Sequence, residues 1–481
     1  MAFFTRYRPK TEAGMTYPAP GPLKASLPAT RTAANPPVPA IKGMGNVPAR
    51  VPRARSGTAL VPAGERAPTR KLRTGPFSVL DIGSTKIVCL IGRGEPDNTI
   101  RILGHGWRRS HGVRSGGIVD LREAESAIRA AVAQAEDMAT ERRDSIFVNL
   151  SCGHPESRHI NARWPIGGRE ITKTDVSRII AEARARALTE GRSAIHTLPL
   201  DYAVDDTQEV LDPRGHLCDL LSARLHVIDA NTTALRNLEA VLSRVELKIE
   251  GMVSSPLASG LAVMNEDERN LGATVVDMGG GTTSIGVFGE GRLLHTATIP
   301  VGGLHITRDI AHGLSTSIDN AERLKTIHGS AELLAGDDHD PILVQLIGDN
   351  DHHYVKIPRA KIVSIIHPRV EETLEMVRDR LEMAAVGPAS DGRVILTGGG
   401  SLLEGIGPMA ARILNRQVRL GRPRRIVGLP ENPATWPMFS TSAGLLAWAA
   451  GAADEMGEPD TRNARPDSLV RRFVDFIRDR V

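Results

Sequence analysis

The feature that most restricts the fold of this chain is a duplicated strand–turn–strand motif. One copy reads Leu-Asp-Ile-Gly-Ser-Thr-Lys at Leu80–Lys86, and the other reads Val-Asp-Met-Gly-Gly-Gly-Thr-Thr at Val276–Thr283. Each copy places an aspartate at the end of an apolar strand and follows it with a glycine turn that carries hydroxyl side chains. Glycine lets the backbone approach a phosphate closely, and successive backbone N–H groups form an anion-binding nest. The duplication therefore predicts two similar α/β halves, each supplying one phosphate-binding turn.

A third glycine-rich segment lies late in the chain. Gly398, Gly399 and Gly400 stand between a predicted strand and a predicted helix, where a backbone can pass under a nucleotide. The aspartates of the two hairpins, Asp81 and Asp277, can hold Mg²⁺ through its water ligands. Each motif alone more often marks a plain turn, and the sequence contains no Walker-type P-loop pattern. The two hairpins and the glycine triplet together predict a nucleotide site.

These motifs together resemble the actin-like ATPase superfamily of actins, Hsp70 chaperones and sugar kinases. The resemblance implies an α/β, actin-like (ribonuclease H-like) two-domain fold that binds ATP and Mg²⁺, with Asp81 and Asp277 as the ligands of Mg²⁺ waters. Glu322 and Lys325 resemble the superfamily's Glu-x-x-Lys helix, which faces ribose and adenine; a surface ion pair between residues i and i+3 is the alternative. The other nucleotide-binding residues that the resemblance implies are Gly83, Ser84, Thr85, Lys86, Gly279, Gly280, Gly281, Thr282, Thr283, Gly398, Gly399 and Gly400.

Hydrophobic periodicity predicts the elements around these motifs. Strands are expected at 77–82, 86–92, 101–107, 145–150, 159–166, 194–204, 224–228, 273–278, 283–288, 292–300 and 393–396. Helices are expected at 120–139, 174–189, 232–244, 304–313, 319–328, 359–386, 401–414 and 441–453. This mixture of strands and helices is typical of an α/β protein.

Within the superfamily, the chain resembles the FtsA family of bacterial cell division proteins from about Pro76 to Val481. Gly116–Leu121 is similar to the family's segment before the first long helix, and Pro300–Gly303 with Thr307–Ile310 is similar to a later loop and helix. Residues 158–229 have the length and position of the family's inserted 1C (SHS2-type) subdomain. The resemblance implies domain 1A at 76–157 and 230–268, domain 2A at 269–302 and 387–453, and domain 2B at 303–386.

The family resemblance also implies partners and a cellular role. A scaffold of this kind polymerises into filaments, binds the C-terminal peptide of FtsZ on domain 2B, and contacts later division proteins through 1C. It anchors the Z-ring to the cytoplasmic face of the inner membrane at the division site. We expect weak or negligible ATP hydrolysis, because no side chain stands out as the group that would orient an attacking water.

The two ends of the chain have unusual compositions. Residues 1–75 carry thirteen lysines and arginines, two glutamates and twelve prolines, so we expect a disordered basic arm of net charge +11. The whole chain has a net charge of +4, so the remainder is at −7 and nucleic-acid binding is not expected. No apolar run is long enough for a transmembrane helix.

The last residues read as an amphipathic helix, 467–481, that follows a polar linker at 454–466. A helix with one apolar and one basic face suits the interface of an anionic membrane. A terminal helix that packs on its own domain is the alternative. The predicted membrane-contacting residues are the apolar Leu469, Phe473, Val474, Phe476 and Ile477 and the basic Arg471, Arg472 and Arg478.

Three other functions fit parts of the pattern. A soluble actin-like ATPase or kinase would need a positioned catalytic base, and none stands out. An Hsp70-type chaperone would need a substrate-binding β domain, for which too few residues follow the predicted fold. A PilM-like pilus assembly ATPase shares the fold and the insertion but normally lacks the terminal amphipathic helix.

Overall fold

The computed structural model describes residues 72–187, 189–348, 354–384, 386–387, 389 and 392–452. The predicted basic arm up to residue 71, the linker at 454–466 and the amphipathic helix at 467–481 lie outside these residues. In the described part of the chain, no helix is both long enough and apolar enough to cross a lipid bilayer.

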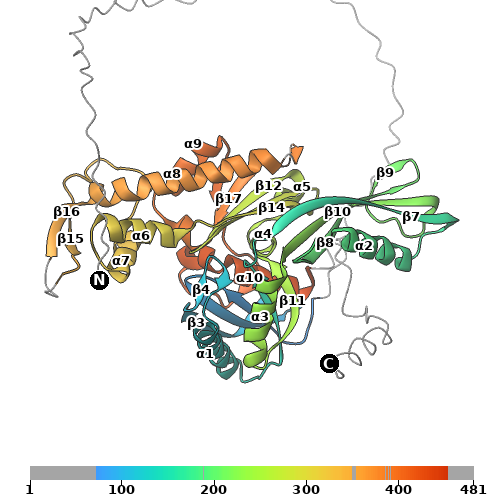
Figure 1. Ribbon diagram of the computed structural model, residues 1–481, viewed down its shortest axis with the longest axis horizontal. Helices are drawn as coiled ribbons and strands as arrows, with labels where there is room; N and C mark the ends of the chain where they lie inside the picture. The colour runs from blue at the N-terminus through green and yellow to red at the C-terminus, as the bar shows by residue number, and fades with distance from the viewer. Residues whose placement is uncertain are drawn as a thin grey trace, which may run out of the picture. The chain divides into compact units, whose positions relative to one another are not determined.

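The first half is built on a six-stranded mixed sheet in the order β11-β6-β1-β2-β3-β19 (Figure 1). Strand β1 pairs antiparallel with β2 and parallel with β6. Helix α1 packs on β2 and β3, and Asp120 caps it by accepting hydrogen bonds from the N–H groups of Arg122 and Glu123. The elements are β1 (Phe77–Ile82), β2 (Lys86–Gly94), β3 (Ile100–Arg109), β4 (Val113–Arg114), β5 (Gly117–Ile118), α1 (Leu121–Ala139), β6 (Ser145–Leu150), α3 (Thr232–Arg244), β11 (Lys248–Ser254) and β19 (Ile426–Val427).

The second half repeats this arrangement in a five-stranded sheet of order β14-β13-β12-β17-β18. Strand β12 pairs antiparallel with β13 and parallel with β17, as β1 does with β2 and β6, so the predicted duplication is confirmed. The elements are α5 (Glu266–Leu271), β12 (Ala273–Met278), β13 (Thr283–Gly289), β14 (Arg292–Ile299), α6 (Gly303–Gly313), α7 (Ile318–His328), β15 (Pro341–Gln345), β16 (Tyr354–Pro358), α8 (Arg359–Ala384), β17 (Arg393–Thr397), α9 (Ile406–Leu414) and β18 (Val418–Leu420).

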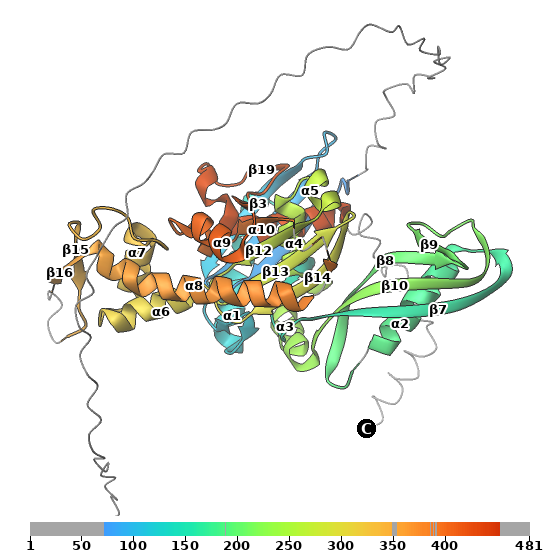
Figure 2. The same ribbon diagram turned by 90° about the horizontal axis from the view of Figure 1, so that it is seen from above.

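The predicted insertion forms a separate antiparallel sheet of order β7-β10-β8-β9 with its own small core. Figure 2 shows α2 against one face of this sheet. The strands β7 and β10 are longer than predicted because they pair over almost their whole length. The elements are β7 (Glu156–Glu170), α2 (Lys173–Ala187), β8 (Arg192–Val204), β9 (Thr207–Val210) and β10 (Leu217–Asn231).

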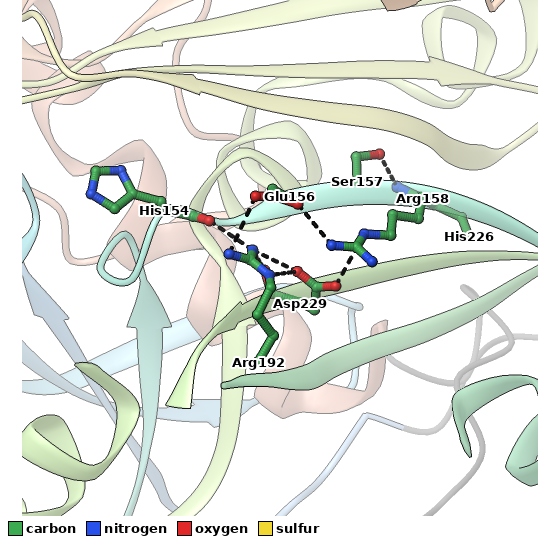
Figure 3. Close-up of polar contacts among 7 residues, drawn as sticks. All are labelled: His154, Glu156, Ser157, Arg158, Arg192, His226 and Asp229. Carbon is green, nitrogen blue, oxygen red and sulfur yellow. Dashed lines mark hydrogen bonds and ion pairs between the residues drawn. The ribbon is translucent and has the colours of Figure 1, made fainter. Parts of the chain in front are cut away.

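A cluster of charged side chains joins strands β7, β8 and β10 at the base of the insertion (Figure 3). The buried carboxylate of Asp229 accepts from Arg192 at 2.6 Å and lies 3.4 Å from Arg158, and both arginines also pair with Glu156. On the side of the second half, His226 Nδ1 lies 2.9 Å from a β14 carbonyl oxygen. The insertion therefore contacts the edge strand of the second half as well as the half into which it is inserted.

Two helices lie between the two large sheets. Helix α4 (Ser255–Val263) packs on β12 and β13, whereas α10 (Ser440–Ala447) packs on β1, β2 and β6 and on α4. Their apolar side chains join one core cluster that includes residues of both sheets, such as Val79 and Val275. The two halves thus share a core at the base of the cleft between them.

The structure corrects three predictions. The segment 387–453 does not belong wholly to the second half, because β19 pairs with β3 and α10 lies on the first sheet. The helix predicted at 401–414 is a 3-10 turn (Gly399–Leu402) followed by α9, because Gly405 takes a positive φ of 75° between them. The helix predicted at 441–453 is α10 followed by a π-helical turn, Trp448–Ala452.

The predicted boundary of the basic arm is also too late. Arg73, which was assigned to the arm, donates its N–H to the carbonyl of Ala450 at 3.0 Å and forms an ion pair with Glu250 at 2.6 Å. Leu72 packs against the core cluster shared by the two halves. Residues 72–75 therefore belong to the described fold, because Leu72 has an apolar contact and Arg73 has hydrogen-bond partners.

Candidate functional site

A cavity of about 550 Å³ lies between the two halves, a size typical of small-molecule sites. Its walls come from the β1–β2 turn, the β12–β13 turn, helix α7 and the turn after β17. The structure thus brings together segments that are up to about 300 residues apart. The predicted nucleotide and metal residues that line the cavity are Asp81, Gly83, Ser84, Thr85, Lys86, Asp277, Gly279, Gly280, Gly281, Thr282, Glu322, Lys325, Gly398, Gly399 and Gly400.

The two hairpin turns have the same backbone geometry. Gly83 N–H donates to the carbonyl of Lys86 at 3.0 Å, and Gly279 N–H donates to the carbonyl of Thr282 at 2.9 Å. A Cβ at either glycine would lie 2.9 Å from that same carbonyl oxygen. Any larger residue would open the turn, so the glycine is required for its shape.

The two turns both line the cavity and touch each other directly. A Cβ built on Gly281 would lie 2.8 Å from the Cβ of Ser84, and one built on Gly280 would lie 2.3 Å from the Cγ2 of Thr85. The second turn is held in place because its carbonyls at Gly279 and Gly280 accept from the first N–H groups of α6 at 2.9 and 2.8 Å. A group bound in the cavity against both turns would therefore contact both halves of the molecule.

Two buried carboxylates lie at the ends of β1 and β12. Asp81 accepts from the hydroxyl of Ser442 at 2.9 Å, and Asp277 accepts from the hydroxyls of Thr441, at 2.9 Å, and Ser259. Burial raises the pKa of Asp81 to about 6 and also raises the pKa of Asp277. Two desolvated carboxylates beside a cavity suit a hydrated divalent cation, which would restore their ionised forms.

Lys86 supplies the positive charge of the first turn. Its ammonium donates to the carbonyl of Met438 at 2.7 Å and lies 3.9 Å from the centre of the Phe439 ring. Burial lowers its pKa to about 8, although Asp81 and Asp277 oppose that shift. An anion in the cavity would favour the charged form of this lysine.

Glu322 and Lys325 form an ion pair that faces the cavity. Lys325 Nζ lies 2.7 Å from the Glu322 carboxylate and donates to the hydroxyl of Thr307 at 2.9 Å. The ammonium is largely buried, with its side chain 16% exposed. The ion pair of the alternative interpretation therefore exists, and both of its residues line the cavity.

The third glycine segment approaches Asp277 closely. Gly398 has a φ of 82°, and its N–H donates to the carbonyl of Pro437 at 3.1 Å. A Cβ at this position would lie 2.2 Å from Asp277 Oδ1. Both the positive φ and this close approach exclude a side chain at Gly398.

One predicted residue, Thr283, does not reach the cavity. Its hydroxyl is buried and donates to the carbonyl of Val301 at 2.8 Å. Thr283 begins β13, where successive side chains point to opposite faces of the sheet, and the next residue, Ser284, lines the cavity instead. The predicted membrane residues between Leu469 and Arg478 lie outside the described part of the chain.

Sequence reasoning missed several lining residues. Asn149 is the penultimate residue of β6 and accepts from the N–H of Ile82 at 2.8 Å, which fixes the end of β1. Its position was predictable in principle, since parallel strands end at the same edge of a sheet. Trp107, Met438 and Thr441 also line the cavity, but only the tertiary fold brings them there.

Comparison with known proteins identifies the family. The family model "Cell division protein FtsA" matches residues 274–444, and the family model "SHS2 domain inserted in FTSA" matches residues 152–229. The cell division protein FtsA of Agrobacterium fabrum is 44% identical over 392 residues, which cover 79% of this chain and 88% of that protein. The chain belongs to the FtsA family. Its actin-like fold, with two α/β halves and an SHS2 insertion, confirms the fold predicted from the sequence.

Other similarities agree with membership of the FtsA family. The FtsA of Escherichia coli K12 is 32% identical over 389 residues, covering 79% of this chain and 91% of that protein. A solved chain of the PilM–PilN type IV pilus biogenesis complex superposes with a TM-score of 0.57 at 17% identity, covering 80% of this chain and 99% of that chain. The PilM likeness concerns the fold alone, whereas the sequence relatives are FtsA cell division proteins.

Proposed function

We propose that the cleft binds ATP with Mg²⁺ and that nucleotide binding holds the two halves together. The observation that carries this proposal is the pair of equivalent glycine turns that meet at the wall of one cavity. Backbone N–H groups of both turns would cradle the phosphates, with Lys86 as a nearby cation. Asp81 and Asp277 would hold Mg²⁺ through water, and the cation would neutralise phosphate charge.

The remaining lining residues would bind the nucleoside. Glu322 and Lys325 on α7 present a carboxylate and an ammonium to the cavity for ribose and adenine. Gly398, Gly399 and Gly400 also line the cavity, and because they have no side chains a flat base can approach their backbone closely. Thr283 has no direct part in this proposal, because its hydroxyl is used within the second half.

Calorimetric titration of ATP tests the nucleotide site. We expect one nucleotide per chain and tighter binding with Mg²⁺ than with a chelator. Asp277→Asn keeps a hydrogen-bond acceptor for Thr441 but removes the charge, so it should weaken binding only when Mg²⁺ is present. Asp267→Asn, at an exposed position of α5, is the matched control. Wild-type binding by Asp277→Asn would contradict the role proposed for the carboxylates.

We further propose that the chain is a membrane-attached scaffold of the division machinery. Its membership of the FtsA family supports a role in division, and the composition of 467–481 suits an interfacial anchor. A single helix of this length binds lipid weakly, so self-association into filaments would supply avidity. The proposed location is the inner face of the cytoplasmic membrane at the division site.

Each proposed partner is assigned to a different part of the fold. The C-terminal peptide of FtsZ would bind the 2B region, 303–386, and later division proteins would bind the insertion, 158–229. The insertion contacts β14 of the second half, so a partner that binds it could sense whether the halves are closed. Pull-down with a chain lacking 158–229 tests this assignment, which predicts loss of the later proteins and retention of the FtsZ peptide.

A further inference from the structure

Four large apolar side chains line the cavity and are also exposed. They come from β3, from α7, from the 3-10 turn that follows β17 and from the 3-10 helix Pro433–Phe439, and they are Trp107, Ile327, Leu402 and Met438. A single exposed apolar side chain is common on a protein surface, but several around one cavity indicate a ligand with an apolar part. The glycine turns and the two carboxylates account for the phosphates and Mg²⁺ of the proposed nucleotide and leave these four side chains unexplained.

Trp107 is the largest of the four and belongs to the first sheet. It pairs in register with Val88, and Val88 belongs to the core cluster shared by the two halves. Paired residues of neighbouring strands lie on the same face of a sheet, so Trp107 lies on the face that carries the shared core. The residue is nevertheless 57% exposed, and its indole N–H has no hydrogen-bond acceptor among the described residues. Both the ring face and the N–H group are therefore free to contact a ligand.

An ion pair next to Trp107 joins this end of β3 to the second half. Arg109 follows two residues later and so lies on the same face of the strand, and its guanidinium lies 2.8 Å from the carboxylate of Asp319 in the first turn of α7. Both side chains are exposed, so the pair adds little stability by itself. The contact nevertheless shows that β3 and α7, the helix proposed to face ribose and adenine, meet on one side of the cleft.

The other three apolar side chains lie on the elements proposed to bind the nucleoside. Ile327 belongs to α7, and Leu402 ends the turn that begins at Gly399. Met438 lies against the same turn, because a Cβ built on Gly399 would be 3.8 Å from its Cγ. The base is the flat, largely apolar part of a nucleotide and gains from contact with such side chains, whereas the phosphates do not.

We infer that the indole of Trp107 packs on the purine base of the bound nucleotide. This inference rests on the proposed binding of ATP and extends it, because the first half then contacts the base as well as the phosphates. Stacking of an aromatic side chain on a base strengthens binding by about 5- to 150-fold. Trp107 is thus a nucleotide-binding residue that lies outside every glycine motif of the chain.

Titration of the full chain with Mg-ATP tests the inference. The wild type is compared with Trp107→Ala, which removes the ring, and with Trp107→Phe, which keeps a smaller one. Tyr354→Ala is the matched control, because Tyr354 is an aromatic residue of similar exposure, 52%, on β16 and is not among the residues that line the cavity. Calorimetry gives the affinity, and quenching of indole fluorescence by ATP reports direct contact with the ring.

Tripolyphosphate with Mg²⁺ is the second ligand, because it has the charge of the nucleotide but no base. Its binding is measured as the rise in melting temperature that it causes at high concentration. A residue that contacts the base should affect ATP and not tripolyphosphate, whereas a residue that only supports the fold should affect both ligands.

We expect Trp107→Ala to weaken ATP binding by about 5- to 150-fold and to leave the stabilisation by tripolyphosphate unchanged. Trp107→Phe should lose less affinity than Trp107→Ala, because its ring still stacks, and should lose the quenching seen in the wild type. Tyr354→Ala should bind ATP as the wild type does. Because Trp107 is exposed, the melting temperature of each ligand-free variant should stay close to that of the wild type.

Three results would overturn the inference while the proposed nucleotide site stands. They are wild-type ATP affinity in Trp107→Ala, full quenching in Trp107→Phe, and parallel losses of ATP and tripolyphosphate binding, which would show that Trp107 only supports the fold. An equal loss of ATP affinity in Tyr354→Ala would also overturn it. If the wild type binds neither ATP nor tripolyphosphate in the presence of Mg²⁺, the proposed function itself fails, and the inference fails with it.

Discussion

Replacing Gly281 with alanine should weaken Mg-ATP binding by preventing the two turns from closing. The added Cβ would lie 2.8 Å from the Cβ of Ser84 and 3.0 Å from the Cα of Ser115, both in the first half. Carbon atoms prefer separations of about 3.5–4.0 Å, so the turns must move apart by about 0.5–1 Å. Overpacking of this kind costs about 1–3 kcal/mol.

The overpacking destabilises the arrangement in which the two turns touch. The atoms nearest to the added Cβ belong to the first half, whereas Gly281 belongs to the second. Nucleotide affinity should therefore fall by about 5- to 150-fold, since 1.4 kcal/mol corresponds to a factor of ten. Calorimetry gives the affinity, and thermal unfolding with and without Mg-ATP gives the stabilisation by ligand. The melting temperature of the nucleotide-free chain should change little, because each half keeps its core.

Gly407→Ala provides the matched control. Gly407 lies in α9, and no atom lies within 4 Å of the position that an added methyl group would occupy, so alanine there should leave the affinity unchanged. Wild-type affinity of Gly281→Ala would refute the idea that both turns close on the nucleotide. Equal losses of nucleotide affinity in both variants would show that the loss does not arise from overpacking in the cleft.

Two further predictions concern buried charge. Because burial raises the pKa of Asp81 to about 6 in the folded chain, its contribution to stability is fully present below about pH 4 and is lost as the pH rises through 6. Nucleotide-free Asp81→Asn should therefore be more stable than wild type at pH 8, by up to about 3 kcal/mol in urea unfolding, with no difference near pH 4; lower stability at pH 8 would contradict this. At the insertion, Arg192→Ala leaves Asp229 with only Arg158 at 3.4 Å and should cost about 3 kcal/mol. The control Arg186→Ala breaks only an exposed ion pair within a helix and should lower the unfolding free energy by at most about 0.5 kcal/mol. Equal losses of unfolding free energy in the two variants would show that the Asp229 cluster stabilises the fold no more than an exposed ion pair does.

The sequence was most informative where a local constraint fixes the structure. The glycine turns at Gly83 and Gly279 are short, and their shape depends on the absence of a side chain, so the two turns could be predicted from a few residues. The alternating pattern of β13 could also have excluded Thr283 from the site, because its neighbour Ser284 points to the other face.

Other features depend on contacts between distant segments. The two-residue strand β19 exists only because Ile426 and Val427 pair with the start of β3, and no local pattern marks it. Helix α10 was assigned to the wrong half because its apolar face does not reveal which sheet it covers. Asn149 was missed for a similar reason, since its role depends on β6 lying beside β1.

Vesicle co-sedimentation of the full chain and of a chain ending at Pro466, with and without Mg-ATP, tests the central claim most directly. The account predicts that only the full chain pellets with anionic vesicles and that Mg-ATP increases the pelleted fraction by favouring assembly. If both chains remain in the supernatant with lipid, the membrane-scaffold proposal is wrong, and the cleft belongs to an actin-like nucleotide-binding protein that acts away from the membrane.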